Sequence, residues 1–308
     1  MDPLPFADHQ HLKSPLRRAP PHGLQVRVSP MRTVRLLVSY NGLCFYGWQR
    51  QDGFISVQQA LEEGAAALLD DCIVVQGAGR TDAGVHGLRQ VAHTQLESDL
   101  DDVTLRHAWN AHLGEGLVIR RIETCRPDFH ARFDARGKRY LYRVQTARFR
   151  PPIGEGYAHW LRAPLDLAAM REAAAQLVGK HDFRAFGNTR RYMDSRGRSK
   201  EEQRATRSTV RTITGLRILA QREGLGIFVA GDGFLYNMVR TIAGTLLEVG
   251  RGQMDVGSTG RALKSGERRD AGPTAPAAGL YLLRVVYDEP IFQGPDPGPK
   301  GLPGAFRE

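Results

Sequence analysis

A short glycine-rich loop carries the pair of charged side chains in this sequence that could do chemistry together. Residues 77–87 read GAGRTDAGVHG, and their four glycines allow the backbone to take positive φ and to approach a ligand closely. The centre of the loop holds one carboxylate, Asp82, and one guanidinium, Arg80. An acid and a base on a loop between two apolar runs indicate a functional site. A hairpin turn that happens to carry charge explains the loop equally well when it is taken alone.

The composition favours an anionic partner for the chain. The 308 residues contain 43 Lys and Arg against 33 Asp and Glu, a net charge of +10, which favours a polyanion such as nucleic acid. The hydrophobic fraction of 41% is ample for a core, and no apolar run approaches the length of a membrane span. The three cysteines are far apart and odd in number. They argue against a disulfide framework or a zinc site and favour a reducing compartment, the cytoplasm.

The elements that position the loop follow the order βαββαβ along the first half of the chain. Ser56 opens the first helix, with Gln59 at the capping-box position. Apolar periodicity then gives the other elements. The series is a strand from Arg32 (VRLLVSY), the helix after Ser56, and then Cys72–Gln76 and Gln90–Leu96 as strands, Val103–Leu113 as a helix and Leu117–Thr124 as a strand.

The same order repeats in the second half. Tyr140 lies in an alternating strand, and the last helix is predicted to end at Gly250, a typical C′ glycine. The predicted elements are the strand Lys138–Thr146, the helix Asp166–Val178, the strands Thr209–Leu219 and Gly226–Ala230, the helix Phe234–Val249 and the strand Leu280–Tyr287.

These patterns predict an α+β fold of two ferredoxin-like units, residues 32–126 with the glycine loop and residues 127–290. The two units are expected to join into one mixed, mainly antiparallel sheet with helices packed on it. The opposite face of the sheet would then be free for a large ligand, as in RNA-recognition modules of similar topology. Two ends lie outside the units: residues 1–31 are interpreted as a disordered extension, with Met31 as an alternative start, and residues 291–308 as a Pro/Gly-rich tail.

A basic stretch, residues 187–208, interrupts the second unit. It holds seven Lys and Arg against three acids and few apolar residues. A solvated surface loop is one interpretation of such a stretch. The other is a flexible basic arm that closes on RNA phosphates, and the sequence slightly favours it.

Several long strings resemble, in the right order, those of the TruA-type tRNA pseudouridine synthases. The string GRTDAGVHG, with QVAHT after it, resembles the signature loop of that family. Matches extend over most of residues 32–289, and several ordered motifs are far more specific than any one of them. The other matching strings are SYNGLCFYGWQRQ, SVQQALE, FHARFDARGKRYLYRV, GFLYNMVRTIAGTLLEVGRG and AGPTAPAAGLYLLRVVY.

The resemblance implies the pseudouridine synthase fold, with an active-site cleft between the two units. It implies isomerisation of uridine to pseudouridine at positions 38, 39 and 40 in the anticodon stem-loop of tRNA. The reaction breaks the N-glycosidic bond, turns the uracil and rejoins it through carbon, without a metal or other cofactor. The family acts as a homodimer with tRNA as its partner, and a membrane partner is not expected.

The resemblance also assigns roles to four side chains. Asp82 takes the position of the catalytic aspartate, acting either as a nucleophile toward the sugar carbon or as a base in a glycal-type route. Arg240 takes the place of the arginine that keeps this carboxylate charged and oriented. Tyr140 matches the tyrosine whose ring stacks on the uracil and whose hydroxyl assists proton transfer. Arg80 resembles the loop arginine that helps to hold the target nucleotide out of its stack.

Two other functions remain possible on the residues alone. A non-catalytic RNA-binding protein could use the same sheet and would not need Asp82. A nucleotide-phosphate enzyme could use GAGRTDAG as a phosphate loop, but the spacing matches neither G-x-G-x-x-G nor the P-loop, and no helix follows directly.

Overall fold

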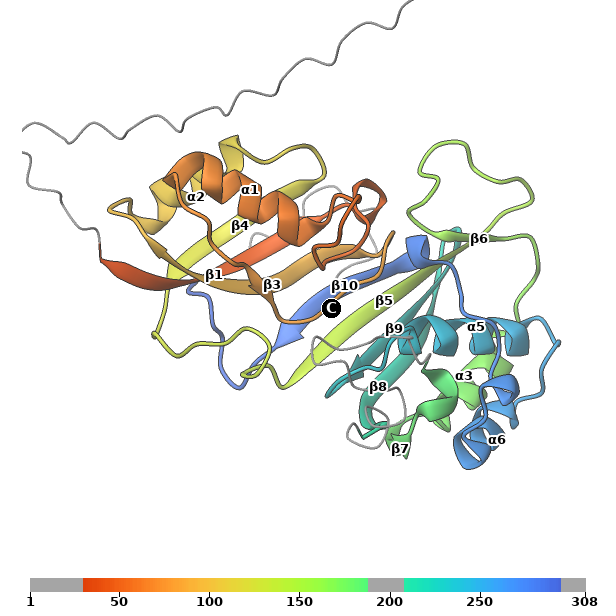
Figure 1. The fold of residues 1–308 in the computed structure, drawn as a ribbon. Helices are drawn as coiled ribbons and strands as arrows, with labels where there is room; N and C mark the ends of the chain where they lie inside the picture. The colour runs from red at the N-terminus through yellow and green to blue at the C-terminus, as the bar shows by residue number, and fades with distance from the viewer. Residues whose placement is uncertain (1–29, 188–207, 295–308) are drawn as a thin grey trace, which may run out of the picture.

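One mixed sheet runs through the residues that the computed structural model describes, 30–187 and 208–294 (Figure 1). Its strand order is β4-β1-β3-β10-β5-β9-β8-β7, with β2 beside β3 and β6 beside β5. Most neighbours are antiparallel, whereas β3 with β10 and β5 with β6 are parallel. The sequence predicts a disordered N-terminal extension, a basic arm and a C-terminal tail, and these segments lie almost wholly outside the described residues. The division into units at residues 126 and 127 stays a prediction.

The first unit has the predicted order βαββαβ, with its strands in the spatial order β4-β1-β3-β2. Ser56 caps α1 as expected, because its hydroxyl accepts the backbone N–H of Gln59 at 3.2 Å. The elements are β1 (Met31–Tyr40), the short 3-10 helix η1 (Gly42–Cys44), α1 (Val57–Leu69), β2 (Gln76–Gly77), β3 (His86–Glu97), α2 (Asp102–Ala111) and β4 (Leu117–Thr124).

The strands beside the glycine loop differ from the prediction in length. A strand was expected over Cys72–Gln76, but β2 has two residues only. Side chains satisfy the backbone just before it: Val75 N–H donates to Glu62 Oε1 at 3.1 Å, and the carbonyl of Val74 accepts the hydroxyl of Thr94 at 2.9 Å. These groups therefore have partners without a neighbouring strand. On the other side β3 begins at His86, inside the loop.

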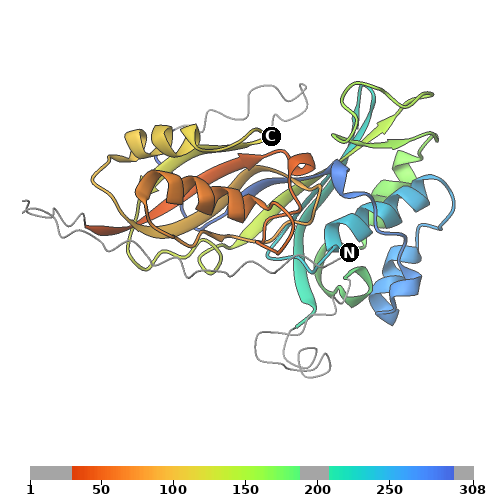
Figure 2. The same ribbon diagram turned by 45° about the horizontal axis from the view of Figure 1, so that its top comes forward.

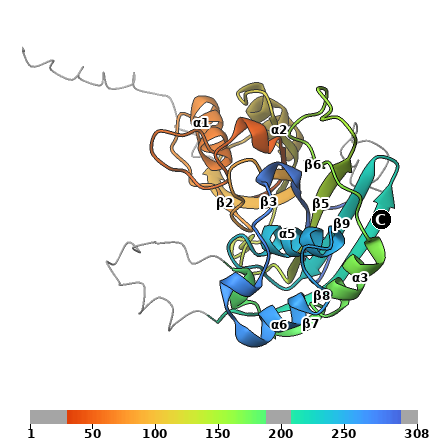
Figure 3. The ribbon, with the colours of Figure 1, turned by 90° about the vertical axis from the view of Figure 1, so that its right-hand side faces the viewer.

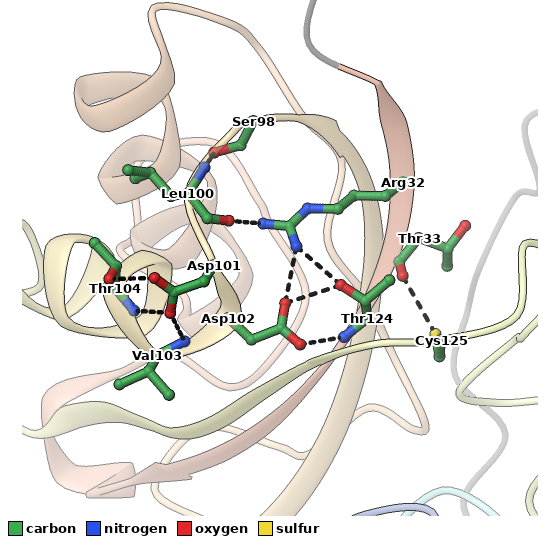
Figure 4. Close-up of polar contacts among 10 residues, drawn as sticks. All are labelled: Arg32, Thr33, Ser98, Leu100, Asp101, Asp102, Val103, Thr104, Thr124 and Cys125. Carbon is green, nitrogen blue, oxygen red and sulfur yellow. Dashed lines mark hydrogen bonds and ion pairs between the residues drawn. The ribbon is translucent and has the colours of Figure 1, made fainter.

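A polar network ties the start of β1 to α2 and to the end of β4 (Figure 4). Arg32 donates to Asp102 Oδ1 at 2.9 Å, and Asp102 also accepts the backbone N–H and the hydroxyl of Thr124, both at 2.8 Å. Asp101 caps α2 by accepting two backbone N–H groups of its first turn at 2.9 Å. The hydroxyl of Thr104 also donates to Asp101, and these hydrogen bonds hold the pKa of Asp101 below its usual value.

The second unit repeats the order, with its strands arranged β10-β5-β9-β8. Besides the short 3-10 helices, three elements were not expected from the sequence: the strands β6 and β7 and the helix α6. The elements are β5 (Gly137–Thr146), β6 (His159–Leu161), α3 (Leu167–Ala175), β7 (Gly179–Asp182), η2 (Arg184–Phe186), β8 (Val210–Gln221), β9 (Gly224–Gly231), α5 (Met238–Gly250), α6 (Ser258–Ser265), η3 (Arg268–Asp270), η4 (Ala277–Gly279) and β10 (Leu280–Val286).

The helix α5 begins four residues later than predicted and continues past the predicted stop. Asn237, just before it, has a left-handed backbone with φ of 61°, so the residues from Phe234 do not join the helix. Gly250 was expected to end the helix as a C′ glycine, but it is helical, and Gly252 takes the positive φ of 70° instead. Gly250 has a packing role, because a Cβ there would lie 2.6 Å from the sulfur of Met170 on α3.

The helices of both units cover the same face of the sheet. Directly paired residues of adjacent strands point to one face, and the register pairs Tyr40 with Gly87, Gly87 with Leu282, and Leu282 with Tyr140. Tyr40 belongs to the core packed by α1 and α2, and Tyr140 to the core packed by α3 and α5. Figure 2 and Figure 3 show these helices as two separate groups. The sequence predicts a ligand on the bare face, whereas Tyr140 points to the face that carries the helices.

The two units meet at the centre of the sheet. Only Tyr281 with His86 and Leu282 with Gly87 pair in the β3–β10 ladder. No helix among the described residues is both long and apolar enough to cross a membrane.

Candidate active site

The structure brings Asp82 of the glycine loop together with Arg240 of α5. The guanidinium Nη1 donates to Asp82 Oδ2 at 3.2 Å, across 158 positions of sequence. About a fifth of each side chain is exposed, 20% for Asp82 and 18% for Arg240. A charge-assisted hydrogen bond in a partly dry setting stabilises the ionised carboxylate and fixes its direction. The remaining exposed area leaves the carboxylate accessible to a ligand.

Arg240 is itself held by two further acceptors. Its Nε donates to the carbonyl of Ala275 at 2.8 Å, and its Nη1 donates to Asn237 Oδ1 at 3.1 Å. The backbone of Ala275 returns a hydrogen bond to the carbonyl of Arg240 at 3.1 Å. Asn237 reaches the guanidinium from a left-handed backbone that costs free energy for any residue except glycine. The guanidinium is therefore positioned before any substrate binds.

The loop that carries Asp82 is held by the segment after β1. Trp48 N–H donates to the carbonyl of Thr81 at 3.0 Å, and the hydroxyls of Tyr40 and Thr81 are 2.9 Å apart in a buried contact. Gly47 has φ of 87°, and a Cβ there would lie 2.5 Å from the Thr81 carbonyl oxygen. The backbone of this segment therefore touches the residue next to Asp82 and leaves no room for a side chain between them.

Tyr140 lies on β5, near enough to Asp82 to feel its charge. Only 8% of it is exposed, and its ring meets Phe234 edge to face at 5.2 Å and 84°. Burial raises the pKa of the Tyr140 hydroxyl far above its ordinary value, and the nearby Tyr40 and Asp82 raise it further. The hydroxyl therefore stays protonated. It makes no hydrogen bond within the described residues, so it remains available to a ligand.

Arg80 stands on the same loop as Asp82 and, among the described residues, is not hydrogen-bonded to these three. Its side chain is exposed, and it has no hydrogen-bond or ion-pair partner in the part of the chain that the structure describes. It stands two positions before Asp82, so it lies at the rim of the same loop. The structure thus brings Asp82, Arg240 and Tyr140 together and leaves Arg80 free to meet a ligand.

Sequence reasoning missed the residues that support this group. Asn237 and the Ala275 carbonyl hold the guanidinium, and Gly47 and Trp48 support the loop, yet none of them carries a separate chemical signal. A signal for Gly47 exists in hindsight, because a glycine between two aromatic residues, Tyr46 and Trp48, indicates a special backbone position.

In this arrangement the Asp82 carboxylate can attack an electrophilic carbon or remove a proton. The ring of Tyr140 offers an apolar surface on which a nucleobase could stack. No cluster of three or more His, Cys, Asp or Glu that could hold a metal was found among the described residues. Two cavities lie elsewhere, of about 610 Å³ at α6 and about 500 Å³ beside β2, and neither is lined by these three side chains.

Known proteins resemble this chain over most of its length. A family model described as tRNA pseudouridine synthase matches residues 173–288. The protein called tRNA pseudouridine synthase A from Acetivibrio thermocellus is 36% identical over 257 residues, which are 83% of this chain and 100% of the relative. The protein of the same name from Syntrophotalea carbinolica is 39% identical over 257 residues, 83% of this chain and 97% of the relative. The one from Agrobacterium fabrum is 38% identical over 264 residues, 85% of this chain and 94% of the relative.

Proposed function

The chain belongs to the tRNA pseudouridine synthase family, and from that premise we propose that it isomerises uridine at positions 38, 39 and 40 in the anticodon stem-loop of tRNA. One observation above all supports this proposal: the Asp82 carboxylate accepts a hydrogen bond from Arg240 at 3.2 Å, near the buried Tyr140. The excess of 43 basic over 33 acidic residues supports a polyanionic substrate.

In the proposed reaction the target uridine leaves its stack and enters the space beside Asp82. Flipping costs a few kcal/mol, and the exposed Arg80 at the rim of the loop offsets part of that cost by contact with the strand. The ring of Tyr140 stacks on the uracil and holds its plane while the base turns. The ionised Asp82 then acts in one of two ways.

In the first route Asp82 attacks the sugar carbon, and the uracil leaves with the electrons of the glycosidic bond. In the second route the carboxylate removes a proton from the sugar, and a glycal forms as the uracil leaves. In the first route the uracil then attacks the sugar carbon through its own carbon 5 and displaces the Asp82 carboxylate. In the second route carbon 5 adds to the glycal, and the proton held by Asp82 returns to the sugar. In both routes the proton on carbon 5 is released, and the uracil nitrogen that left the sugar takes up a proton. Arg240 keeps the carboxylate charged and directed in either case.

We further propose that the enzyme acts as a homodimer with tRNA as its partner. A tRNA in contact with many cations releases counterions on binding, so its affinity should fall steeply with salt. A flat salt response would count against this proposal.

The position of modification is tested with unmodified tRNA transcripts that carry uridine at 38, 39 or 40. After incubation with the enzyme, pseudouridine is mapped by carbodiimide treatment and primer extension. The proposal predicts stops at those three positions and at no other uridine of the anticodon arm. Tight binding of tRNA with no new pseudouridine at any position would favour a non-catalytic RNA-binding protein instead.

A further inference from the structure

Lys138 lies against the backbone of the catalytic loop. It stands on β5 two residues before Tyr140, so the two side chains point to the same face of the sheet. A Cβ built on Gly79 would lie 2.9 Å from Lys138 Cε and 3.1 Å from its Nζ. The ammonium group therefore rests on the loop three residues before Asp82. Three residues of chain span at most about 10 Å.

The surroundings of Lys138 are positive. Its side chain is half-buried, and no carboxylate or carbonyl among the described residues is its hydrogen-bond partner. Burial lowers the pKa of the ammonium, and the charges of Arg132 and Arg211 lower it further. A half-buried cation beside two others costs free energy in the empty enzyme.

The register places Arg211 on the same side of the sheet as Lys138. Lys138 pairs with Gly231 of β9, and Gly231 pairs with Ile213 of β8. Arg211 is two residues before Ile213, so it shares that face. Gly231 adds no side chain at the β9 position beside Lys138. Lys138 and Arg211 are therefore two cations on one face of the sheet, and Lys138 touches the loop that carries Asp82.

We propose that Lys138 binds the phosphate group that flanks the target uridine on one side, with Arg132 and Arg211 contributing to the positive field there. This inference rests on the proposed function. The anions nearest to a ribose held at Asp82 are the phosphates on either side of that nucleotide, and an ammonium is a good point-charge partner for a phosphate. The contact is made equally in the bound and reacting states, so it contributes to affinity and not to the chemical step.

The test is a double-mutant cycle between protein and RNA. Lys138→Met keeps the aliphatic chain that packs on Gly79 and removes the charge. Two anticodon stem-loop RNAs each carry one uncharged methylphosphonate linkage, placed 5′ or 3′ to the target uridine. The dissociation constant is measured for each pairing of enzyme and RNA.

For unmodified RNA we expect Lys138→Met to weaken binding about tenfold, as for a hydrogen bond to a charged group. One of the two neutral linkages should weaken binding to the wild type by a similar factor. The same linkage should cause no further loss in the variant. The slope of log affinity against log salt should fall by about one. Lys138→Arg should restore most of the affinity, and kcat should stay close to the wild-type value.

Lys264→Met is the matched control, because Lys264 is an exposed lysine on α6. It should respond to both neutral linkages as the wild type does. Lys138→Gln, checked by thermal unfolding, provides a second neutral variant if the methionine variant is unstable. The proposal is overturned if, for both linkages, the loss of affinity from Lys138→Met and the loss from the neutral linkage are independent, so that the two factors multiply. It is also overturned if Lys138→Met lowers kcat and leaves affinity unchanged. Failure of the wild type to form pseudouridine would overturn the proposed function instead, since the cycle reads binding alone.

Discussion

At the scale of single residues, the proposed chemistry depends on how rigidly one guanidinium is held. Arg240 donates to Asp82, to Asn237 and to the carbonyl of Ala275. Asn237 is one of two non-glycine residues with positive φ among those described, and strained backbone of this kind gathers at functional sites. The strain at Asn237 is explained if its amide oxygen positions Arg240.

Replacing Asn237 separates this positioning from the backbone strain. Asn237→Gly and Asn237→Ala both remove the oxygen that accepts from Arg240, so both should lower the single-turnover rate about tenfold. Only alanine resists the left-handed backbone, so Asn237→Ala should also be about 1 kcal/mol less stable than Asn237→Gly. Rates on tRNA and urea unfolding measure the two effects. Wild-type rates in both variants would show that Asn237 has no positioning role.

At the scale of elements, the loop that carries Asp82 is shaped by the segment that follows β1. Gly47 and Trp48 contact the backbone of Thr81. At the other end of the loop Gly42 contacts the backbone of Val85, because a Cβ at position 42 would lie 2.4 Å from it. The loop is thus fixed by backbone contacts on both sides of Asp82. Gly42 and Gly47 permit this close approach of two backbones, whereas the glycines of the loop itself make room for side chains, such as Trp48 at Gly77 and Tyr40 at Gly87.

Gly47→Ala tests this support, with Gly53→Ala as its matched control. Both glycines have positive φ, 87° and 78°, so both alanines carry a similar strain of about 1 kcal/mol. Only the Cβ at position 47 meets the loop, at 2.5 Å from the Thr81 oxygen, whereas position 53 has nothing within 4 Å. We expect the Gly47 variant alone to lose tenfold or more of its rate, about that for a displaced catalytic group. Equal rates in the two variants would contradict the role given to this contact.

The repeated order βαββαβ could be predicted from the sequence because most of its elements carry a local signal, whereas β6, β7 and α6 were not expected. The Ser56 cap and the apolar spacing of α1 are examples, and both lie within a few residues of the element they define. The length of β2 could not be predicted, because the Glu62 side chain takes the backbone N–H that a strand would have paired. Likewise, the start of α5 depends on Asn237, which has a left-handed backbone. Its side-chain oxygen accepts a hydrogen bond from Arg240, which is positioned only once the helix has folded.

The candidate site was predictable only through the resemblance. Nothing in the local sequence around Asp82 or Arg240 shows that they meet, since 158 positions separate them. The support from Gly47 and the position of Lys138 follow from tertiary contacts. The open face of the sheet stays a prediction as a ligand surface, whereas Tyr140 points to the face that carries the helices of both units.

At the scale of the whole molecule, the two units are joined by the short β3–β10 ladder, in which His86 is paired with Tyr281. The His86 ring stacks between Tyr157 and Tyr281, at 5.3 and 4.5 Å. Its Nδ1 accepts the backbone N–H of Gly42 at 3.1 Å, so this nitrogen carries no proton. Its Nε2–H faces the carbonyl oxygens of Gly156 and Ala278, at 3.2 and 3.1 Å. The imidazole therefore links three segments of both units.

This junction should weaken in acid. Burial lowers the pKa of His86 below its ordinary value, and the charge of Arg143 lowers it further, against the opposing effect of the two carbonyls. Above about pH 6.5 the ring is neutral in both the folded and unfolded chains. Below that value the unfolded chain takes up a proton first, so the free energy of unfolding falls until the folded pKa is passed.

Urea unfolding at about pH 7.5 and about pH 5 measures this effect. Burial also lowers the pKa values of His93 and His159, so His86→Gln should remove part of the acid-induced loss. His107→Gln, on the exposed side of α2, should leave the loss unchanged. An undiminished loss in the His86 variant would show that this histidine does not couple the junction to pH.

The central claim is that the Asp82 carboxylate does the chemistry on a uridine of tRNA. Tritium release from tRNA labelled at carbon 5 of uridine tests it most directly, because that hydrogen leaves only when the base rejoins through this carbon. The wild type should release tritium, and Asp82→Asn should release none while binding tRNA with unchanged affinity. Release by Asp82→Asn at the wild-type rate would contradict the account.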